Sequence, residues 1–477
     1  MNISDLTITK AHEGLKNREF SSKELTLTYL ENIKNKDNQI NSYLAITEEL
    51  ALDQAERADQ AINNAEKEKK DFPLLMGIPC SIKDSIVVKD YPSTSASKIL
   101  ENYISPYDAT VIKKLKEQGS VMLGKTNLDE FAMGVSTENS AFKTTKNPHD
   151  LTRVPGGSSG GSAASVAAEE AMYSLGSDTG GSIRLPASFS GVVGLNPTYG
   201  AVSRYGLIAL ASSLDQIGPI TKTVEDCKIV FEAIAGQDDF DSTCQVFQFE
   251  EKDIDIKGLT IGIAKEYFAK GIDSDVEKII KNAIDIAEKH GAKIQEISLP
   301  TTKYAIAVYY IIVPSEASAN LARYDGIKYG LSTKDAKDLL DVYVRSRGKG
   351  FGEEPKRRIL IGTYALSSGY YDQYYHKANQ VRELIKDDFR KAFEKVDLIF
   401  SPVSPIPSFK VGEKANDPLS MYLMDVYTCP LKLAGLPAIS IPAGKIGPLP
   451  VGLQIIGNYF QENKILSIAY KMEKMLQ

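Results

Sequence analysis

The feature that most constrains the fold is a strand–helix–strand pattern in residues 257–300. Its first part alternates apolar with other residues, as a strand with one buried face does, and its middle part carries apolar residues at helical spacing. The alternating residues are Leu259, Ile261 and Ile263, and the helix face comprises Val276, Ile279, Ile280, Ala283, Ile284 and Ala287. Gly291 ends the helix, and a second strand follows at residues 294–299. Because helical crossovers join parallel strands, this segment predicts one βαβ unit.

A similar alternation extends over most of the chain and predicts its fold class. Between residues 73 and 220, short β-branched runs alternate with Gly/Ser loops and helical segments such as Thr110–Gln118. After Asp397 the sequence again has short strand-like runs separated by prolines. We therefore expect one large α/β domain, built on a mixed, mostly parallel β-sheet that is flanked by helices on both faces. Near its start, Ser21 and Glu24 have the spacing of a helix capping box.

Charge and rare side chains exclude several functional classes. The chain has 56 Lys and Arg against 62 Asp and Glu, a net charge of −6, so no overall basic field can hold a nucleic-acid backbone. If RNA is involved, a partner is expected to carry it. The cysteines form no CxxC pair, and the histidines are too scattered for an HExxH-type metal site. These residues are Cys80, Cys227, Cys244, Cys429, His12, His149, His290 and His376.

The pattern at the N-terminus and the length of the apolar runs bear on localisation. Residues 1–5 lack the basic and then apolar run of a signal peptide. The longest uninterrupted apolar stretch, Tyr304–Val313, has about half of the ~20 residues that a membrane span requires. We expect a soluble, cytoplasmic protein whose sparse cysteines remain reduced.

Glycine and serine are concentrated in residues 155–194, and three functional interpretations compete there with a purely structural one. The structural interpretation is a pair of tight turns around a small-residue helix, Ala163–Ala171. A phosphate-binding loop is disfavoured because GxxxxGK[ST] does not occur. A nucleophile elbow formally matches GxSxG with Ser159 at its centre, but it needs a downstream histidine, and only His290 and His376 follow.

The third functional interpretation is an amide hydrolase whose base is a lysine. Lys83 lies in GIPCSIKDSIVV, among apolar and small residues at the end of a strand-like run. Burial would favour its neutral amine, because desolvation penalises the charged form. The alternative is an ordinary surface lysine paired with Asp84.

Three motifs in order resemble the amidase signature family of serine amidohydrolases: GIPCSIKD, PGGSSGGSA and SLGSDTGGSIRLPASFSGVVGLNPTYG. The resemblance implies that Ser182 is the nucleophile, Ser158 the bridging serine and Lys83 the base, with a cis peptide bond before Ser158. Ser159 is then not the nucleophile. The oxyanion is expected to be held by main-chain N–H groups of the turn Thr179, Gly180, Gly181 and Ser182, where glycine permits close approach. No metal or cofactor is implied in this chain.

Further segments resemble the branch of this family that supplies ammonia to tRNA-dependent amidotransferases. They include GKTNLDEFAMGVSTENSAF, RRILIGTYALSSGYYDQYY and DPLSMYLMDVYTCPLKLAGLPAISIPAG. By that likeness the amide donor is glutamine, with Arg358 on its α-carboxylate, Asp425 on its α-ammonium and Tyr309 lining the pocket. Composition alone would place Arg358 on a solvated helix face and Asp425 at a partly buried cap. Small departures, Cys80 and Val135, touch no catalytic position.

The resemblance also implies partners and a division of the chain. A B subunit would bind tRNA and activate its glutamyl group with ATP and Mg²⁺, and a small C subunit would wrap both chains; we find no ATP-binding motif here. The rival is a stand-alone amidase acting on small amides. The expected regions of the one domain are a helical start (1–70), a catalytic core (73–220), a βαβ and helical substrate-pocket region (257–395), and strands and a helix that rejoin the sheet (397–477).

Overall fold

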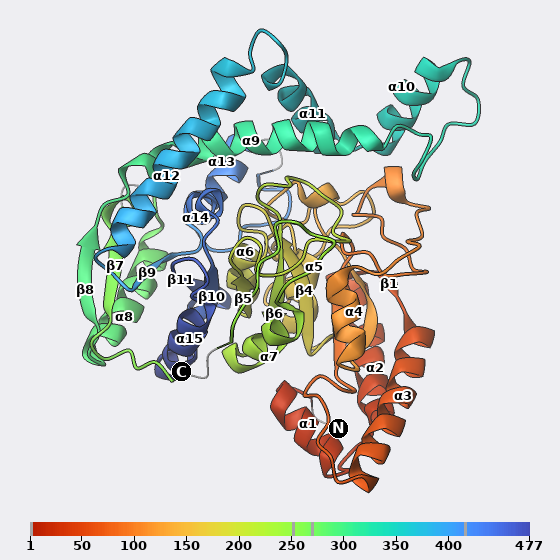
Figure 1. Ribbon diagram of the computed structural model, residues 1–477, viewed down its shortest axis with the longest axis vertical. Coiled ribbons are helices and arrows are strands. Elements are labelled where there is room, and N and C mark those ends of the chain that lie inside the picture. Colours follow the sequence, from red (N-terminus) through yellow and green to blue (C-terminus); the bar gives the residue numbers. More distant parts are fainter. Residues whose placement is uncertain (1–2, 250–252, 269–270, 415–416) are drawn as a thin grey trace.

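Eleven strands form one sheet in the part of the chain that the structure describes, a computed structural model covering residues 3–249, 253–268, 271–414 and 417–477 (Figure 1). The strands are β1 (Tyr43–Ile46), β2 (Pro79–Lys83), β3 (Val121–Thr126), β4 (Tyr173–Asp178), β5 (Val193–Asn196), β6 (Gln216–Thr221), β7 (Thr260–Ala264), β8 (Lys293–Ile297), β9 (Leu398–Pro402), β10 (Ala438–Ile446) and β11 (Leu449–Ile456). Their order across the sheet is β1-β3-β2-β4-β6-β5-β10-β11-β9-β7-β8. The last strands of the chain therefore lie beside strands from its first half.

The sheet is mixed, but the expectation that it is mostly parallel is wrong. Parallel pairs occur in two blocks, β3-β2-β4 near one edge and β9-β7-β8 at the other. Between these blocks, every pairing from β4 through β6, β5, β10 and β11 to β9 is antiparallel. One of these pairings has a local cause: β10 and β11 are joined by a tight hairpin, and a hairpin forces antiparallel pairing.

Fifteen α-helices surround this sheet within the described residues. They are α1 (Ile8–Lys16), α2 (Ser22–Ile40), α3 (Glu48–Lys67), α4 (Thr110–Glu117), α5 (Gly160–Ala167), α6 (Arg184–Ser190), α7 (Val224–Ile234), α8 (Ser274–Lys289), α9 (Ala305–Asn320), α10 (Leu339–Gly350), α11 (Glu353–Ala365), α12 (Lys377–Phe393), α13 (Pro418–Tyr422), α14 (Cys429–Ala434) and α15 (Glu462–Leu476). The predicted capping box is present at the start of α2, and β7-α8-β8 form the predicted βαβ unit.

Alternate residues of the central strands enter two separate hydrophobic cores. In β9, Leu398 and Phe400 join the core that contains α7, α8 and α15, whereas Ile399 joins the core under α9, α12 and α14. This follows from the period of two in a strand, which sends neighbouring side chains to opposite faces of the sheet. Helices cover both faces, as expected from the sequence, and α5 and α6 lie on the face opposite α7.

Helix α9 is rich in apolar residues. Residues Pro300–Arg323, which include α9, are long and apolar enough to cross a membrane by length and composition, with a mean hydropathy of 1.2 over the best window. Half of that window is buried inside the protein, and α9 packs against α11, α12 and α14. We interpret it as a core helix. Figure 1 shows α9 crossing above one end of the sheet, with α10 projecting beyond it.

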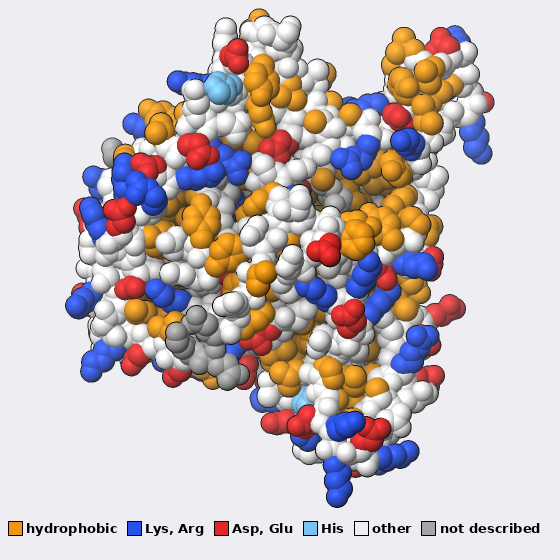
Figure 2. All heavy atoms as spheres, viewed as in Figure 1, with side chains coloured by type: hydrophobic (Ala, Val, Ile, Leu, Met, Phe, Trp, Pro, Cys, Tyr) orange, Lys and Arg blue, Asp and Glu red, His pale blue; other side chains and the backbone are white. Residues whose placement is uncertain are grey.

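Charged side chains of both signs are interspersed over the face of the molecule seen in Figure 2. No continuous basic area is visible on that face, in keeping with the net charge of −6. This face therefore offers no extended track for a nucleic-acid backbone.

Candidate active site

Lys83 is the last residue of β2, and its neighbour β4 runs parallel to it. The carboxyl ends of parallel neighbours meet at one edge of a sheet, so Lys83 lies beside the residues that end and follow β4. Its Nζ lies 2.8 Å from Oγ of Ser158, 2.8 Å from Oγ of Ser159 and 2.9 Å from Oγ of Ser177. The structure therefore brings the predicted base and the predicted bridging serine into hydrogen-bond contact.

The alternative of a surface lysine paired with Asp84 is wrong. Lys83 is fully buried, and Asp84 instead forms an ion pair with Lys125, with 3.1 Å between Nζ and Oδ1. Burial lowers the pKa of Lys83 to about 7, against the opposing influence of the carboxyl groups of Asp129, Asp178 and Asp215. A large fraction of Lys83 is therefore the neutral amine at neutral pH, the form that can accept a proton.

Ser158 and Ser159 immediately precede α5 and occupy different positions. A cis peptide bond joins Gly157 to Ser158, as the family resemblance implies. The Ser159 hydroxyl donates to the main-chain oxygen of Ser177 (3.0 Å) and accepts from the N–H of Ser177 (3.2 Å) as well as from Lys83. Ser159 is fully buried, and these hydrogen bonds satisfy its hydroxyl within the protein. The nucleophile-elbow interpretation, which would expose Ser159 to substrate, is not supported by this geometry.

Ser182 lies in the turn between β4 and α6, close to Ser158 and Ser159. The N–H of Ser159 donates to the main-chain oxygen of Ser182 over 3.1 Å. Ser182 is 7% exposed, and within the described residues its hydroxyl has no hydrogen-bond partner. A partly exposed serine whose hydroxyl makes no hydrogen bond is suited to act as a nucleophile. The hydrogen bond from Ser182 to Ser158 that the mechanism requires is not formed in this structure.

The turn that carries Ser182 is held from both ends. Asp178 accepts from the N–H of Ile183 (3.1 Å) and pairs with the buried Arg184, whose Nε donates to Oδ2 and whose Nη2 donates to Oδ1, both over 3.1 Å. The Thr179 hydroxyl donates to Asp215 over 2.7 Å. In the described part of the chain, the N–H groups of Gly180, Gly181 and Ser182 have no main-chain or side-chain acceptor. Fixed, unpaired N–H groups are what an oxyanion site requires.

Tyr309 and Asp425 reach this same turn from α9 and from the segment before α14. A Cβ on Gly180 would lie 2.5 Å from the Tyr309 hydroxyl, and one on Gly181 would lie 3.2 Å from Oδ1 of Asp425. Gly180 thus leaves the space that the Tyr309 hydroxyl fills, and Gly181 leaves space for Thr428, with Asp425 beside it. The structure places two of the predicted glutamine contacts directly against the predicted oxyanion turn.

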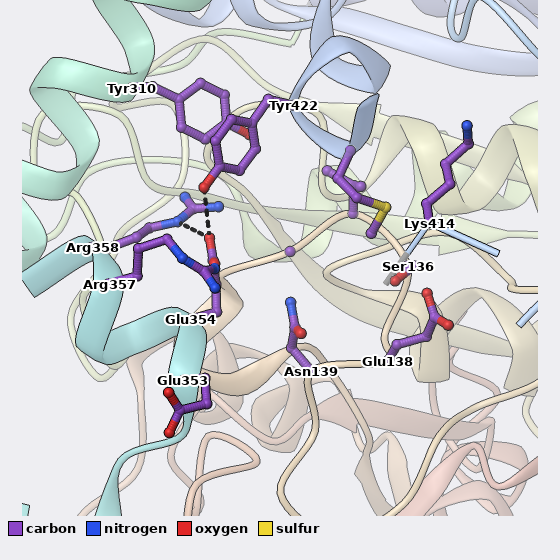
Figure 3. Close-up of a pocket in the computed structure, with 13 residues that line it drawn as sticks. Ser136, Glu138, Asn139, Tyr310, Glu353, Glu354, Arg357, Arg358, Lys414 and Tyr422 are labelled. Atoms are coloured by element: carbon purple, nitrogen blue, oxygen red, sulfur yellow. Dashed lines mark hydrogen bonds and ion pairs between the residues drawn. The ribbon is translucent and has the colours of Figure 1, made fainter. Parts of the chain in front are cut away.

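Arg358 projects from α11 into a cavity of about 270 Å³ (Figure 3). It is only 3% exposed, and its Nε donates to Oε1 of Glu354 over 2.8 Å. Its guanidinium faces the rings of Tyr310 and Tyr422, which stack with 3.8 Å between centroids. The expectation from composition that this arginine lies on a solvated face does not hold, whereas the pocket position implied by the resemblance agrees with its burial.

Asp425 and Arg358 interact through Tyr310. The Tyr310 hydroxyl donates to Oδ2 of Asp425 over 3.4 Å, and the Tyr310 ring lies under the guanidinium. Burial raises the pKa of Asp425 to about 7, partly opposed by Arg358 and by the Tyr310 hydrogen bond. Asp425 therefore gains from a cationic partner, since a nearby positive charge favours the ionised carboxylate.

Several residues of this site were missed by sequence reasoning. Ser177 binds Lys83, and Tyr310 and Tyr422 enclose Arg358 together with Glu354. One signal was available: Glu354 and Arg358 have the i, i+4 spacing that pairs charges on a helix. The Tyr310–Tyr422 contact joins residues from two distant segments, and nothing in local sequence indicates it.

The hydrogen bonds that His149, His290 and His376 make go to residues other than these serines. His149 contacts the main-chain oxygen of Ser190, His290 that of Ile286, and His376 the side chain of Gln380. Over the described residues, no three His, Cys, Asp or Glu side chains form a group that could hold a metal ion.

Comparisons with known proteins find relatives over nearly the whole chain. The family model of the amidases matches residues 24–466. The A subunit of the glutamyl-tRNA(Gln) amidotransferase from Caldanaerobacter subterraneus subsp. tengcongensis is 58% identical over 480 residues, 99% of this chain and 97% of that protein. A crystal structure of the corresponding protein from Thermotoga maritima matches 99% of this chain and 95% of its own at 43% identity, with a TM-score of 0.82. The peptide amidase of Stenotrophomonas maltophilia matches 99% and 97% at 26% identity, with a TM-score of 0.80.

Proposed function

Because this chain belongs to the amidase family, we propose that it hydrolyses glutamine as the A subunit of a tRNA-dependent amidotransferase. The ammonia released would convert glutamate on tRNA(Gln) to glutamine, at a site on a partner protein. The observation that carries the proposal is the hydrogen bond between Ser158 and the buried Lys83, whose pKa burial lowers to about 7. This pair lies next to a turn that Tyr309 and Asp425 contact. Full-length similarity to proteins that carry this name supports it.

In the first step of the proposed mechanism, neutral Lys83 accepts the proton of the Ser158 hydroxyl. Ser158 in turn accepts the proton of Ser182, and Oγ of Ser182 forms a bond to the side-chain carbonyl carbon of glutamine. The carbonyl electron pair moves onto oxygen, where the N–H groups of Gly180, Gly181 and Ser182 stabilise it. One such donor is worth about 2.7–4 kcal/mol of barrier.

The second half returns the proton and frees the enzyme. Protonated Lys83 delivers its proton through Ser158 to the amide nitrogen as the carbon–nitrogen bond breaks, so ammonia leaves and a glutamyl ester remains on Ser182. The same relay then removes a proton from water, which attacks the ester carbonyl. Glutamate departs, and Ser182 recovers its hydroxyl proton.

Glutamine recognition uses both charges at its α-carbon. Arg358 would hold the α-carboxylate, because its planar guanidinium can form two parallel hydrogen bonds to a carboxylate. Asp425 would hold the α-ammonium, and Tyr309 would line the pocket beside the oxyanion turn. The burial of Arg358 and the raised pKa of Asp425 support these roles, since each group lacks full solvation and gains from an ionic partner.

Ammonia release alone does not make an aminoacyl-tRNA, and we propose that partners supply the rest. A B subunit would bind tRNA and activate its glutamyl group with ATP and Mg²⁺, and a C subunit would hold the two chains together. The acidic balance of this chain favours tRNA binding elsewhere in the complex.

The test is to measure ammonia release from glutamine by the chain with and without its B and C partners, in the presence and absence of ATP and Glu-tRNA(Gln). We expect glutaminase activity that rises when the partners and their substrates are present, with Ser182→Ala as the inactive control. Full-rate hydrolysis of simple amides by the chain alone, indifferent to partners, would contradict the proposal.

A stand-alone amidase is the rival function; the fold shared with a peptide amidase does not distinguish the two, and the higher identity to amidotransferase A subunits favours the first. The two differ in what Arg358 must recognise. If free glutamine is the substrate, Arg358→Lys should raise the KM for glutamine by about tenfold or more, since lysine cannot make the paired hydrogen bonds. An amidase for simple amides, which lack an α-carboxylate, would be unaffected by this change.

A further inference from the structure

Glu354 is a carboxylate inside the cavity that, in the proposed function, receives the carboxylate of glutamine. It is nearly buried and accepts from Nε of Arg358 over 2.8 Å, and it also pairs with Arg357. Burial disfavours its charged form, but the ion pairs with Arg358 and Arg357 outweigh burial and lower the pKa of Glu354. Glu354 is thus a buried anion next to the site of another anion, an arrangement that requires an explanation.

The explanation lies in which edge of the guanidinium Glu354 occupies. Its hydrogen bond goes to Nε of Arg358, and in the described residues neither Nη atom of Arg358 has an acceptor. Figure 3 shows Glu354 beside Nε and the two Nη atoms directed away from it. A guanidinium carries five N–H donors in a fixed fork, so one carboxylate on the Nε edge leaves the other edge for a second carboxylate.

Glu354 also joins the two halves of the pocket. Its Oε1 accepts from the Tyr422 hydroxyl over 3.2 Å, so one carboxylate oxygen binds both Arg358 on α11 and Tyr422 at the end of α13. Tyr422 lies three residues before Asp425 and stacks on Tyr310, whose hydroxyl reaches Asp425. The Glu354 carboxylate is therefore held from both sides of the pocket, by Arg358 and by Tyr422.

We infer that Glu354 is a positioning residue for glutamine: it fixes the guanidinium of Arg358 with its Nη edge toward the substrate carboxylate. This inference rests on the proposed function. A neutral residue at this position would leave the guanidinium free to turn against the rings of Tyr310 and Tyr422, and binding of glutamine would then have to order it.

The chain offers a matched pair of variants. Glu354→Gln keeps the side-chain size and one carbonyl acceptor but removes the charge. Glu353→Gln removes one negative charge from the same turn of α11 and the same side of the cavity. The Glu353 side chain is 87% exposed and pairs with Lys356 rather than with Arg358, so this variant controls for a general change in charge.

The experiment measures ammonia release by the complete complex from two substrates, glutamine and 4-aminobutanamide, which is glutamine without its α-carboxylate. In Glu354→Gln we expect the KM for glutamine to rise on the order of tenfold and kcat to change less than about twofold. The kcat/KM for 4-aminobutanamide should stay within about twofold, because that substrate does not use Arg358. Glu353→Gln should leave both substrates within about twofold.

Two results would overturn the inference. An equal loss with both substrates would mean that Glu354 only supports the fold, and a lower or unchanged KM for glutamine would mean that it competes with the substrate or is irrelevant. Should Glu354→Gln fail to fold, Glu354→Asp keeps the charge at a shorter reach, and it should raise the KM for glutamine above the wild-type value while the kcat/KM for 4-aminobutanamide stays unchanged. If the wild-type complex releases no ammonia from glutamine, the proposed function fails instead, which the same assay separates.

Discussion

At the scale of single residues, Lys83 depends on burial for its proposed role as base. A lysine in water holds its proton up to a pH of about 10.4, whereas burial lowers the pKa of Lys83 to about 7. The nearest carboxyl groups limit this shift, and burial raises the pKa of one of them, Asp129, to about 6. Among the described residues no carboxylate forms an ion pair with Lys83, so burial prevails and its neutral form is populated at neutral pH.

The first prediction concerns pH. With saturating glutamine, kcat should rise as pH increases through about 7 and level off above it, because the protonated amine below its pKa cannot accept the Ser158 proton. Saturation matters because the bound ammonium already pairs with Asp425, whose pKa in the empty pocket is also about 7. The measurement is ammonia release from pH 5.5 to 9.5. A rate that keeps climbing toward pH 10 would show that Lys83 titrates as a solvated lysine.

The second prediction separates the serines. Ser182→Ala and Ser158→Ala should each abolish ammonia release, because one removes the nucleophile and the other interrupts the proton relay. Ser159→Ala should retain activity reduced by about tenfold, since it removes only one hydrogen-bond partner of Lys83. Initial rates, with mass spectrometry for a glutamyl adduct on Ser182, provide the readout. Near-normal rates in Ser182→Ala together with an inactive Ser159→Ala would restore the nucleophile-elbow interpretation.

Residue types and motif spacing were enough to predict the catalytic residues, but they did not predict which residues surround them. The scarcity of histidine directed attention to Lys83, and the resemblance indicated Ser158 and Ser182. Ser159 and Ser177, which are hydrogen-bond partners of Lys83, could not be predicted. Their contacts with Lys83 depend on how β2 and β4 align in the folded sheet. Burial of Arg358 likewise depends on tyrosines from α9 and α13.

At the scale of elements, the substrate pocket depends on how closely α9 and α11 pack. Gly362 of α11 lies against the main-chain oxygen of Pro314 in α9, so closely that a Cβ at this position would overlap that oxygen. Helix α9 carries Tyr309 and Tyr310, and α11 carries Glu354 and Arg358. The separation of two backbones therefore sets the distance between the two sides of the pocket.

The third prediction tests this contact. Gly362→Ala should gain up to about 1 kcal/mol in helix propensity but lose more to overpacking, for a net destabilisation of about 1–2 kcal/mol. It should also raise the KM for glutamine severalfold as α11 moves away from α9. Gly348→Ala in α10 is the matched control, because open space surrounds a Cβ there and the gain in helix propensity is unopposed. Thermal unfolding and glutamine kinetics measure both, and equal stabilisation of the two variants would contradict the packing argument.

Hydrophobic periodicity predicted individual helices and strands more reliably than it predicted which strands pair. The βαβ unit over residues 257–300 and the capping box at Ser21 were predictable because each is specified within a short window. The antiparallel middle of the sheet was not, since it depends on β6 and the β10-β11 hairpin inserting between two parallel blocks. Such insertion is decided by long-range packing, which local patterns do not encode.

At the scale of the whole molecule, net charge leads to the fourth prediction. At −6, with charges of both signs interspersed over the visible face, this chain should not hold tRNA by itself. At physiological salt we expect no saturable tRNA binding up to about 100 μM, weaker than the ~10⁻⁴–10⁻⁶ M of non-specific nucleic-acid binders. The complex with its partners should bind tRNA with an affinity that falls steeply as salt rises, because counterions are released from the phosphates. Filter binding at two salt concentrations compares the two samples. Equal affinity of the isolated chain and the complex would place the tRNA site on this chain and would require a basic surface on its opposite face.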